Sequence, residues 1–248
     1  MFASLVLTFF LILALAEGKS LRAEKTNDRP IIGLFTQPTS SKEGTCGGNC
    51  LYVAASYVKY LESAGARVVP INYYASNSQL DTLFNSVNGV FFPGGSASFP
   101  KQAQYIYDKV VAANDAGDYF PLWGTCMGFQ WLMIAQSRNS NILDPKNGQM
   151  DSYNLSIPLN FTSAAKTSRL FKDAGSIYSV LETEDVTMNN HHYGIYPSTF
   201  EATSSLNSFF NVLSTNVDRK GVEFISTVEA FKYPIYGSQW HPEKNNFE

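Results

Sequence analysis

The sequence predicts an α/β fold with a mostly parallel central sheet flanked by helices. From Pro30 to about residue 137, short apolar runs alternate with stretches in which apolar residues have a helical spacing. This order gives a parallel sheet with helices on both faces. The apolar runs are continuous rather than alternating, as in strands buried on both sides. The chain has 248 residues, 44% of them hydrophobic, which is enough for one large domain.

The elements are expected to follow one another in a regular order. Strands at 31–35, 67–71, 89–92 and 119–123 alternate with helices at 51–64, 80–87, 100–114 and 129–135. Asn49 is expected to cap the first helix and Gly65 to end it. From residue 139 onward, turn-rich segments alternate with β-like stretches at 177–181 and 223–228. This second half is expected to add strands that bring His241, near the end of the chain, back to the first half.

A sharp turn is predicted where the strand at 119–123 meets the following helix. Residues 124–128 have the pattern G-x-C-x-G. Strand, turn and helix in this order form a nucleophile elbow, here with a thiol in place of a hydroxyl. The glycines permit the tight turn, and the positive end of the helix favours the thiolate of Cys126. A buried core cysteine is the alternative when this residue is considered alone.

An exposed thiol needs a base, and the chain has three histidines: His191, His192 and His241. His241 follows an apolar stretch at 231–236, and Glu243 stands two residues later. Because residues two apart point the same way in an extended segment, Glu243 is expected to orient the imidazole of His241 toward Cys126. These are the nucleophile, base and orienting roles of a catalytic triad. A surface or core histidine is the alternative for His241 alone.

Gly94 and Gly95 follow the strand at 89–92 and are expected to expose backbone N–H groups. Together with the Met127 N–H they are predicted to form an oxyanion hole, although an ordinary glycine-rich turn explains the local sequence equally well. His191 is expected on a loop that reaches the pocket, with a surface pair as the alternative. The tandem spacing of the two neighbouring histidines does not suit a metal site.

Residues 1–16 are predicted to be a secretory signal peptide, because they are apolar and end in an A-x-A pattern. An anchor helix is the alternative. Residues 17–29 form a polar leader, and the mature chain is expected to have no membrane contact. In a secreted protein, the N-x-[ST] patterns at Asn154 and Asn160 predict N-glycosylation sites. Secretion also allows Cys46 to pair with Cys50, with two free thiols as the alternative. The net charge of −3 and the lack of a basic cluster argue against nucleic acid as a partner.

These residues resemble the γ-glutamyl hydrolase (folylpolyglutamate hydrolase) family of the class I glutamine-amidotransferase-like superfamily. The resemblance runs from residue 30 to residue 243, and the domain is expected at 30–248. Its markers are the stretches at 52–70, 92–96, 123–129 and 239–244. The first reads YVAASYVKYLESAGARVVP and is long enough to be specific to the family. The superfamily alone shares only the elbow and the H-x-E pattern.

The resemblance implies a chemistry. Cys126 would attack the γ-amide carbonyl that links two glutamates, and His241 would protonate the departing amine and then activate water. Glu243 would position the imidazole, and His191 would bind substrate or assist. Substrates would be folates and antifolates with γ-linked polyglutamate tails, without a metal or an organic cofactor. The expected compartments are the lysosome and the extracellular space, and family members are often homodimers.

The chain departs from the family in two respects. Gln130 stands where many relatives have glutamate, which removes a charge near the pocket. Relatives also continue for several dozen residues past the position of Glu248, including a helix that covers the sheet. The chain is therefore expected to be C-terminally short. Either it is a shortened form, or it lacks the helix that covers the sheet. Two other functions stay open: a glutaminase-type amide hydrolase, and a secreted inactive form that binds folate polyglutamates.

Overall fold

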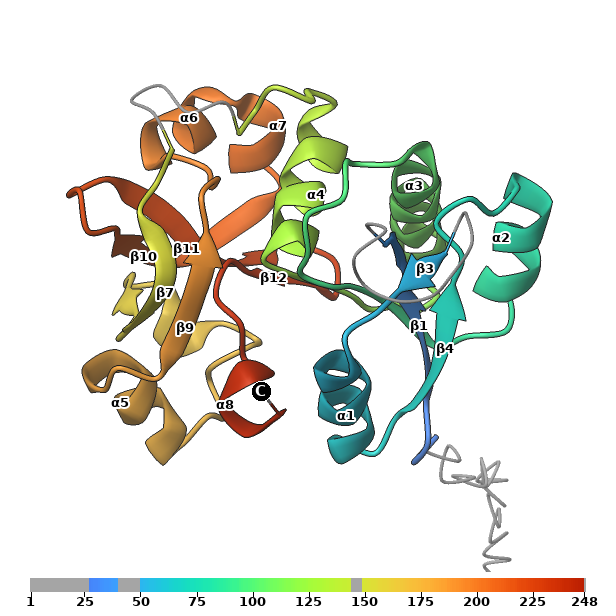
Figure 1. Ribbon diagram of the computed structural model, residues 1–248, viewed down its shortest axis with the longest axis horizontal. Coiled ribbons are helices and arrows are strands. Elements are labelled where there is room, and N and C mark those ends of the chain that lie inside the picture. Colours follow the sequence, from blue (N-terminus) through green and yellow to red (C-terminus); the bar gives the residue numbers. More distant parts are fainter. Residues whose placement is uncertain (1–26, 40–49, 144–148, 248) are drawn as a thin grey trace, which may run out of the picture.

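The protein is built around an eight-stranded sheet, as the computed structural model shows (Figure 1). The structure describes residues 27–39, 50–143 and 149–247. The strand order is β4-β1-β5-β6-β12-β11-β10-β8. In chain order these strands are β1 (Ile31–Phe35), β4 (Arg67–Ile71), β5 (Gly89–Phe92), β6 (Leu122–Thr125), β8 (Asn160–Phe161), β10 (Phe210–Val217), β11 (Glu223–Ala230) and β12 (Ile235–Ser238).

The predicted mostly parallel sheet is confirmed. The strands from β4 to β12 along the sheet are all parallel, and the last three, β11, β10 and β8, are antiparallel. β12 comes last in the sequence, yet it pairs with β6 in the middle of the sheet. The C-terminal part of the described chain is thereby brought next to the strand that precedes the elbow. Two short ribbons stand outside the sheet: β2 (Gln37–Pro38) with β3 (Leu51–Tyr52), and β7 (Ser152–Ile157) with β9 (Thr187–His191).

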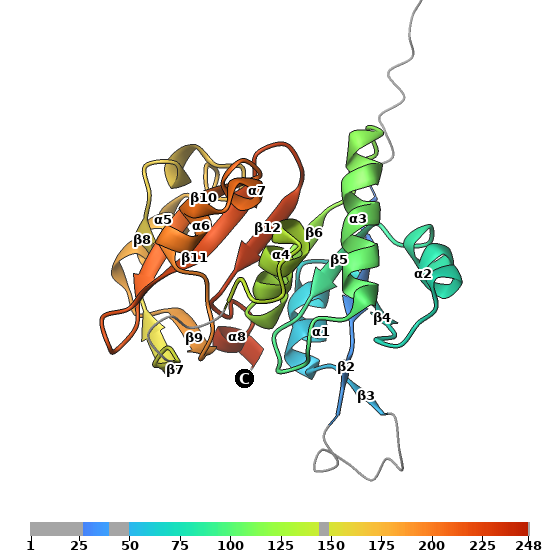
Figure 2. The same cartoon turned by 90° about the horizontal axis from the view of Figure 1, so that it is seen from above.

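Helices cover both faces of the sheet (Figures 1 and 2). One face carries α3 and α4, and the opposite face carries α1. Neighbouring residues of β1 show why: Leu34 belongs to the cluster under α1, while Phe35 belongs to the core under α3 and α4. The helices are α1 (Ala55–Ser63), α2 (Asn77–Phe84), α3 (Lys101–Asp115), α4 (Met127–Ser137), α5 (Ser176–Thr183), α6 (Pro197–Ala202), α7 (Ser204–Asn207), α8 (Lys244–Phe247) and the 3-10 turn η1 (Ala165–Thr167).

The main core lies between the sheet and α4. Trp131 of α4 is 2% exposed and meets Phe35 and Phe92 edge-on, with ring centroids 5.8 and 5.7 Å apart. Edge-to-face contacts of this kind are favourable beyond the area they bury. They hold α4 against β1 and β5, and so fix the position of its N-terminus relative to the sheet.

Four predicted elements differ from the structure. The strand expected at 119–123 begins only at Leu122 and continues to Thr125, into the stretch expected to form the turn. The stretch at 177–181 lies within a helix, α5, and not in a strand. Its apolar residues are spaced one, three and four positions apart, which places them on one side of a helix that packs against the protein with that side. The helix expected at 51–64 begins only at Ala55, because Leu51 and Tyr52 form β3. The helix expected at 80–87 starts earlier, at Asn77, where Ser76 and Gln79 form a capping box.

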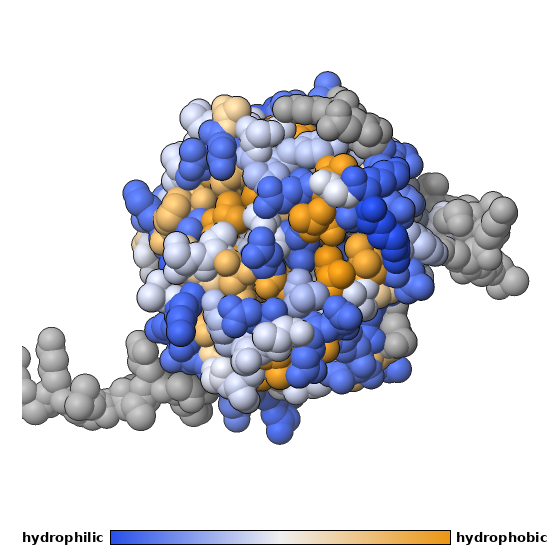
Figure 3. Space-filling view, turned by 90° about the vertical axis from the view of Figure 1, so that its left-hand side faces the viewer, coloured by the Kyte–Doolittle hydropathy of each residue, from blue (hydrophilic) through white to orange (hydrophobic). Residues whose placement is uncertain are grey.

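Some predictions lie outside the described residues, namely the signal peptide at 1–16, the cap at Asn49 and the cysteine at Cys46. Cys50 is described and is disulfide-bonded. Among the residues described, no helix is long and apolar enough to cross a membrane. On the face shown in Figure 3, hydrophobic residues appear in separate spots among hydrophilic ones.

Candidate active site

Cys126 stands on the predicted elbow. It is the single residue between the end of β6 at Thr125 and the start of α4 at Met127, and its φ of 52° is positive. A positive φ is uncommon for a residue with a side chain and is a form of backbone strain that clusters at functional sites. The Cys126 N–H donates to the carbonyl of Ser238 over 2.8 Å, so the elbow is tied to the end of β12.

The glycines of the elbow are needed because backbone segments approach closely there. A Cβ placed on Gly128 would lie 1.9 Å from the carbonyl oxygen of Phe92, and one on Gly124 would lie 2.5 Å from the carbonyl oxygen of Gly128. No side chain fits at either position. The first turn of α4 therefore sits directly against β5 and β6, and Cys126 lies at the carboxyl edge of the sheet, where ligands bind in open α/β folds. The expectation of an exposed thiol is wrong, because Cys126 is only 5% exposed, but the residue lines the cavity at this edge.

His241 and Glu243 follow β12 and reach the same edge. The Nδ1 of His241 lies 2.6 Å from Oε1 of Glu243, and both side chains are buried. The two side chains meet because residues 242 and 243 form a turn that leads into α8. The geometry behind the prediction, an extended segment, is therefore wrong, although the pairing of the two side chains is as predicted.

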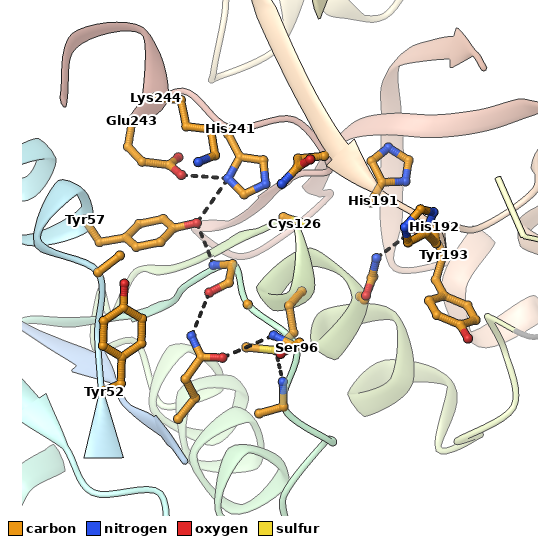
Figure 4. Close-up of a pocket in the computed structure, with 18 of the residues that line it drawn as sticks. Tyr52, Tyr57, Ser96, Cys126, His191, His192, Tyr193, His241, Glu243 and Lys244 are labelled. Carbon is orange, nitrogen blue, oxygen red and sulfur yellow. Dashed lines mark hydrogen bonds and ion pairs between the residues drawn. The ribbon is translucent and has the colours of Figure 1, made fainter. Parts of the chain in front are cut away.

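The imidazole of His241 also lies beside Cys126 (Figure 4). A Cβ built on Gly94 would be 2.8 Å from Cε1 of His241 and 3.3 Å from Cβ of Cys126, so both side chains border one point. Nε2 of His241 has no hydrogen-bond partner within the described structure. It is therefore the ring nitrogen that remains open to the thiol and to a bound ligand.

The electrostatics of this cluster favour a charged imidazole. Burial by itself would lower the pKa of His241, but the negative charges of Cys126 and Glu243 outweigh it and raise that pKa to about 10. The arrangement thus supports a thiolate beside an imidazolium, the reactive form of a catalytic cysteine. The carboxylate on the far side of the ring fixes the Nδ1–H tautomer, because a carboxylate can only accept a hydrogen bond.

The glycine-rich turn is also part of the site. The side chain of Gln37 holds it by donating to the carbonyl of Gly94 over 3.2 Å and accepting from the Ser96 N–H over 3.1 Å. The Gly94 N–H is already used, because it donates to the hydroxyl of Tyr57 over 2.8 Å. The N–H groups of Gly95 and Met127 have no acceptor in the parts of the chain that the structure describes. These two, and not Gly94, are open to a ligand.

A cavity of about 650 Å³ opens above these groups. One wall is the ribbon of β7 and β9, which carries His191 at its end, and the opposite wall is the glycine-rich turn. His191 is 4% exposed, and burial lowers its pKa to about 3, so its ring is neutral. His192 is exposed and stacks on Tyr153 at the rim. His191 therefore lies in the pocket as predicted, and the two neighbouring histidines differ in burial.

Gln130 connects α4 to the loop after β9. Its Nε2 donates to the carbonyl of Tyr193 over 2.8 Å and lies 3.4 Å from Oε1 of Gln239. An ionised glutamate at this position could not donate either bond. Two further predicted residues lie on the surface of the second half: Asn154 and Asn160 are both exposed.

Sequence reasoning missed Tyr57. It lies in the helix expected at 51–64, where it is one more apolar residue, and its ring does pack in the cluster with Leu34 and Phe91. Its hydroxyl, however, reaches the site, 3.2 Å from Nδ1 of His241. The two residues are 184 positions apart, so nothing in the local sequence could reveal the contact. Across the described ranges, no group of three or more His, Cys, Asp or Glu side chains is placed to hold a metal ion.

A cysteine on a strand-to-helix elbow of a mostly parallel sheet, beside a paired histidine and glutamate, is the arrangement expected from the resemblance to the class I glutamine-amidotransferase-like superfamily. A solved structure agrees with this fold: the glutaminase domain of Trypanosoma brucei CTPS with bound acivicin aligns with a TM-score of 0.56 at 15% identity, covering 87% of each chain. The chain belongs to the peptidase C26 family, whose profile matches residues 30–243. The resemblance found in the sequence is thereby confirmed.

Curated relatives carry the name γ-glutamyl hydrolase. The chain is 46% identical to γ-glutamyl hydrolase B of Dictyostelium discoideum over 228 residues, which are 89% of this chain and 64% of that protein. It is 42% identical to the γ-glutamyl hydrolase of Homo sapiens over 229 residues, 90% of this chain and 70% of that protein. The chain thus spans about two thirds of the length of these relatives, and less than that of the first.

Proposed function

We propose that the chain hydrolyses γ-glutamyl bonds in folyl and antifolyl poly-γ-glutamates through a thioester on Cys126. The observation that carries the proposal is the placement of the Cys126 thiol next to the buried His241–Glu243 pair, in a chain of the peptidase C26 family. The names of the relatives supply the bond that is cleaved.

The reaction has two steps. The Cys126 sulfur attacks the carbonyl carbon of the γ-amide, and the imidazolium of His241 gives its proton to the departing amine as the carbon–nitrogen bond breaks. The neutral imidazole then takes a proton from water, which attacks the thioester and releases the acid and the Cys126 thiolate, so that the thiolate–imidazolium pair is restored. The N–H groups of Gly95 and Met127 are the donors that we assign to the developing oxyanion, and Glu243 holds the ring and stabilises its charge.

The pocket suits a substrate with several carboxylates. A γ-linked tail presents one α-carboxylate for each residue. The pocket lining includes the ammonium-bearing Lys244 and the N-terminus of α4, where the helix dipole favours anions. We assign substrate contacts to the neutral ring of His191 and to the amide of Gln130, which line the same cavity.

The test is a product analysis with the purified chain. Folate pentaglutamate is incubated with it at mildly acidic pH and the products are identified by mass, alongside free glutamine as a competing substrate. Shortened folates with released glutamate or oligoglutamate are expected. A preference for free glutamine would indicate a glutaminase-type amide hydrolase. Binding of the pentaglutamate without turnover would indicate the inactive binding form.

We further propose that the protein acts in the secretory pathway, in the lysosome or outside the cell. The apolar stretch at 1–16 supports this, and so does Cys50, because disulfides persist in oxidising compartments. The exposed Asn154 and Asn160 are the proposed glycan acceptors. A homodimer remains a prediction from the family.

Replacing Glu243 with glutamine is expected to lower kcat by about 100-fold or more. The amide removes the negative charge that stabilises the imidazolium, and it can present an N–H toward Nδ1. Because the charge of Glu243 raises the pKa of His241, the alkaline limb of kcat/KM is expected to move to lower pH. The measurement is kcat/KM against pH. Glu62→Gln, a change of the same kind on the exposed side of α1, is expected to leave the profile in place, and an unshifted Glu243→Gln profile would contradict the assignment.

A further inference from the structure

The hydroxyl of Tyr57 joins two parts of the site, the glycine-rich turn and the imidazole of His241. It accepts a hydrogen bond from the Gly94 N–H over 2.8 Å and lies 3.2 Å from Nδ1 of His241 (Figure 4). The residue comes from α1, on the face of the sheet opposite α4. Three segments from distant parts of the chain therefore meet at one oxygen atom.

The hydrogen-bonding capacity of that oxygen is fully used. A tyrosine hydroxyl has one proton to donate and accepts up to two bonds. One acceptor position is taken by the Gly94 N–H, and the second faces the Nδ1–H of the imidazolium, which it shares with Glu243. The phenol proton is left to point toward the Glu243 carboxylate. This arrangement requires a neutral phenol, and burial together with the charges of Glu243 and Cys126 keeps the pKa of Tyr57 well above its ordinary value.

The ring of Tyr57 is held firmly enough to position its hydroxyl. It is 3% exposed and lies against Phe91, with ring centroids 5.6 Å apart. The turn has no freedom on this side, since a Cβ on Gly94 would be only 2.3 Å from the hydroxyl oxygen. Phe91 precedes the turn by three residues on β5, so ring and turn are fixed to the same strand.

We propose that Tyr57 is a positioning residue that couples the Gly94–Gly95 turn to the imidazole of His241. Its hydroxyl holds the oxyanion donor and the base at a fixed distance and orientation relative to each other. This inference takes the catalytic roles from the proposed function. It adds that the Gly94 N–H serves as a structural tether, which leaves the next amide, that of Gly95, to face the substrate.

Several titratable groups surround the His241 ring, and each contributes to its behaviour. They come from the elbow, the C-terminal turn, α1 and β9: Cys126, Glu243, Lys244, Tyr57, Tyr60 and His191. The Tyr57 hydroxyl contacts both the imidazole and the glycine-rich turn. Removing its oxygen leaves every charged group in place, which makes the effect interpretable.

The test compares Tyr57→Phe with Tyr107→Phe. Tyr107 is 1% exposed and its hydroxyl donates to Gln136 between α3 and α4, away from the pocket, so it controls for the loss of a buried tyrosine hydroxyl. The rate of alkylation of Cys126 by iodoacetamide is measured against pH, with thermal unfolding as the check on the fold. This reaction needs no γ-glutamyl substrate, and its outcome stands even where the proposed function fails.

For Tyr57→Phe, the alkaline limb of the alkylation profile, on which the imidazolium of His241 loses its proton, is expected to move to lower pH by about one unit, while the acid limb stays in place. The reason is that the imidazolium loses an acceptor for its Nδ1–H. Tyr107→Phe is expected to keep the parent profile. An unmoved Tyr57→Phe profile, or an equal shift in both variants, would overturn the proposal. Should Tyr57→Phe not fold, 3-fluorotyrosine at position 57, a weaker acceptor of similar shape, is expected to shift the limb the same way, and no shift there would overturn it equally.

Discussion

Replacing Cys126 with alanine is expected to reduce γ-glutamyl hydrolysis by about 10⁴-fold or more, because the acyl-enzyme is proposed to form on its sulfur. The fold is expected to persist. The β carbon stays in place, and the backbone of residue 126 is held by bonds to Ser238 and Gln130 that do not involve the sulfur. The measurement is kcat with folate pentaglutamate, together with thermal unfolding and the binding of the same substrate.

The binding measurement distinguishes a loss of catalysis from a loss of the folded structure. A folded Cys126→Ala chain that binds folate pentaglutamate as the parent does, without turning it over, is the predicted result. Retained turnover would place the nucleophile elsewhere. Loss of both binding and cooperative unfolding would mean that the thiol contributes to the core, the alternative that the sequence left open.

Replacing Gly128 with alanine is expected to lower the free energy of unfolding by about 4 kcal/mol or more, which puts it among the exceptionally damaging substitutions. Alanine has the higher helix propensity, which by itself would favour the variant by about 1 kcal/mol. The loss must therefore be steric. The added Cβ would lie 1.9 Å from the Phe92 carbonyl oxygen and 2.5 Å from its carbon. These are backbone atoms of a central strand, so they cannot move aside as a side chain can.

Urea unfolding of Gly128→Ala, with Gly221→Ala as the control, measures this effect. Gly221 has a φ of 79° and nothing within 4 Å of the position of a Cβ, so its substitution costs only the backbone strain of about 1–2 kcal/mol. A Gly128→Ala loss no greater than that of Gly221→Ala would show that α4 can retreat from β5, and the close contact at the elbow would then not be needed for the fold.

The parts of the molecule that sequence could predict are those set by local patterns. The continuous apolar runs gave the parallel strands, and the elbow was recognisable because tight turns and close backbone contacts restrict the residues at 124 and 128 to glycine. The pairing of His241 with Glu243 was predicted as well, since it spans only two residues, although a turn and not a strand brings them together.

The remainder depends on contacts between distant segments. The role of the Tyr57 hydroxyl and the tethering of the Gly94 N–H arise only when α1, β5 and the segment after β12 are assembled. The stretch at 177–181 was assigned to a strand because its isoleucine, tyrosine and valine favour β-structure. In the fold this stretch lies within an eight-residue helix without a fully buried residue, so its context overrode its propensity.

Stepwise alkylation of the parent chain tests the central claim most directly. Iodoacetamide is added in increasing amounts, the fraction of modified Cys126 is counted by peptide mass, and the remaining hydrolysis of a γ-linked folate polyglutamate is measured in each sample. Cys126 is the free cysteine of the described chain. The predicted result is an activity that falls in proportion to its modification and vanishes when all of it is modified. Full modification of Cys126 with substantial hydrolysis remaining would contradict the account.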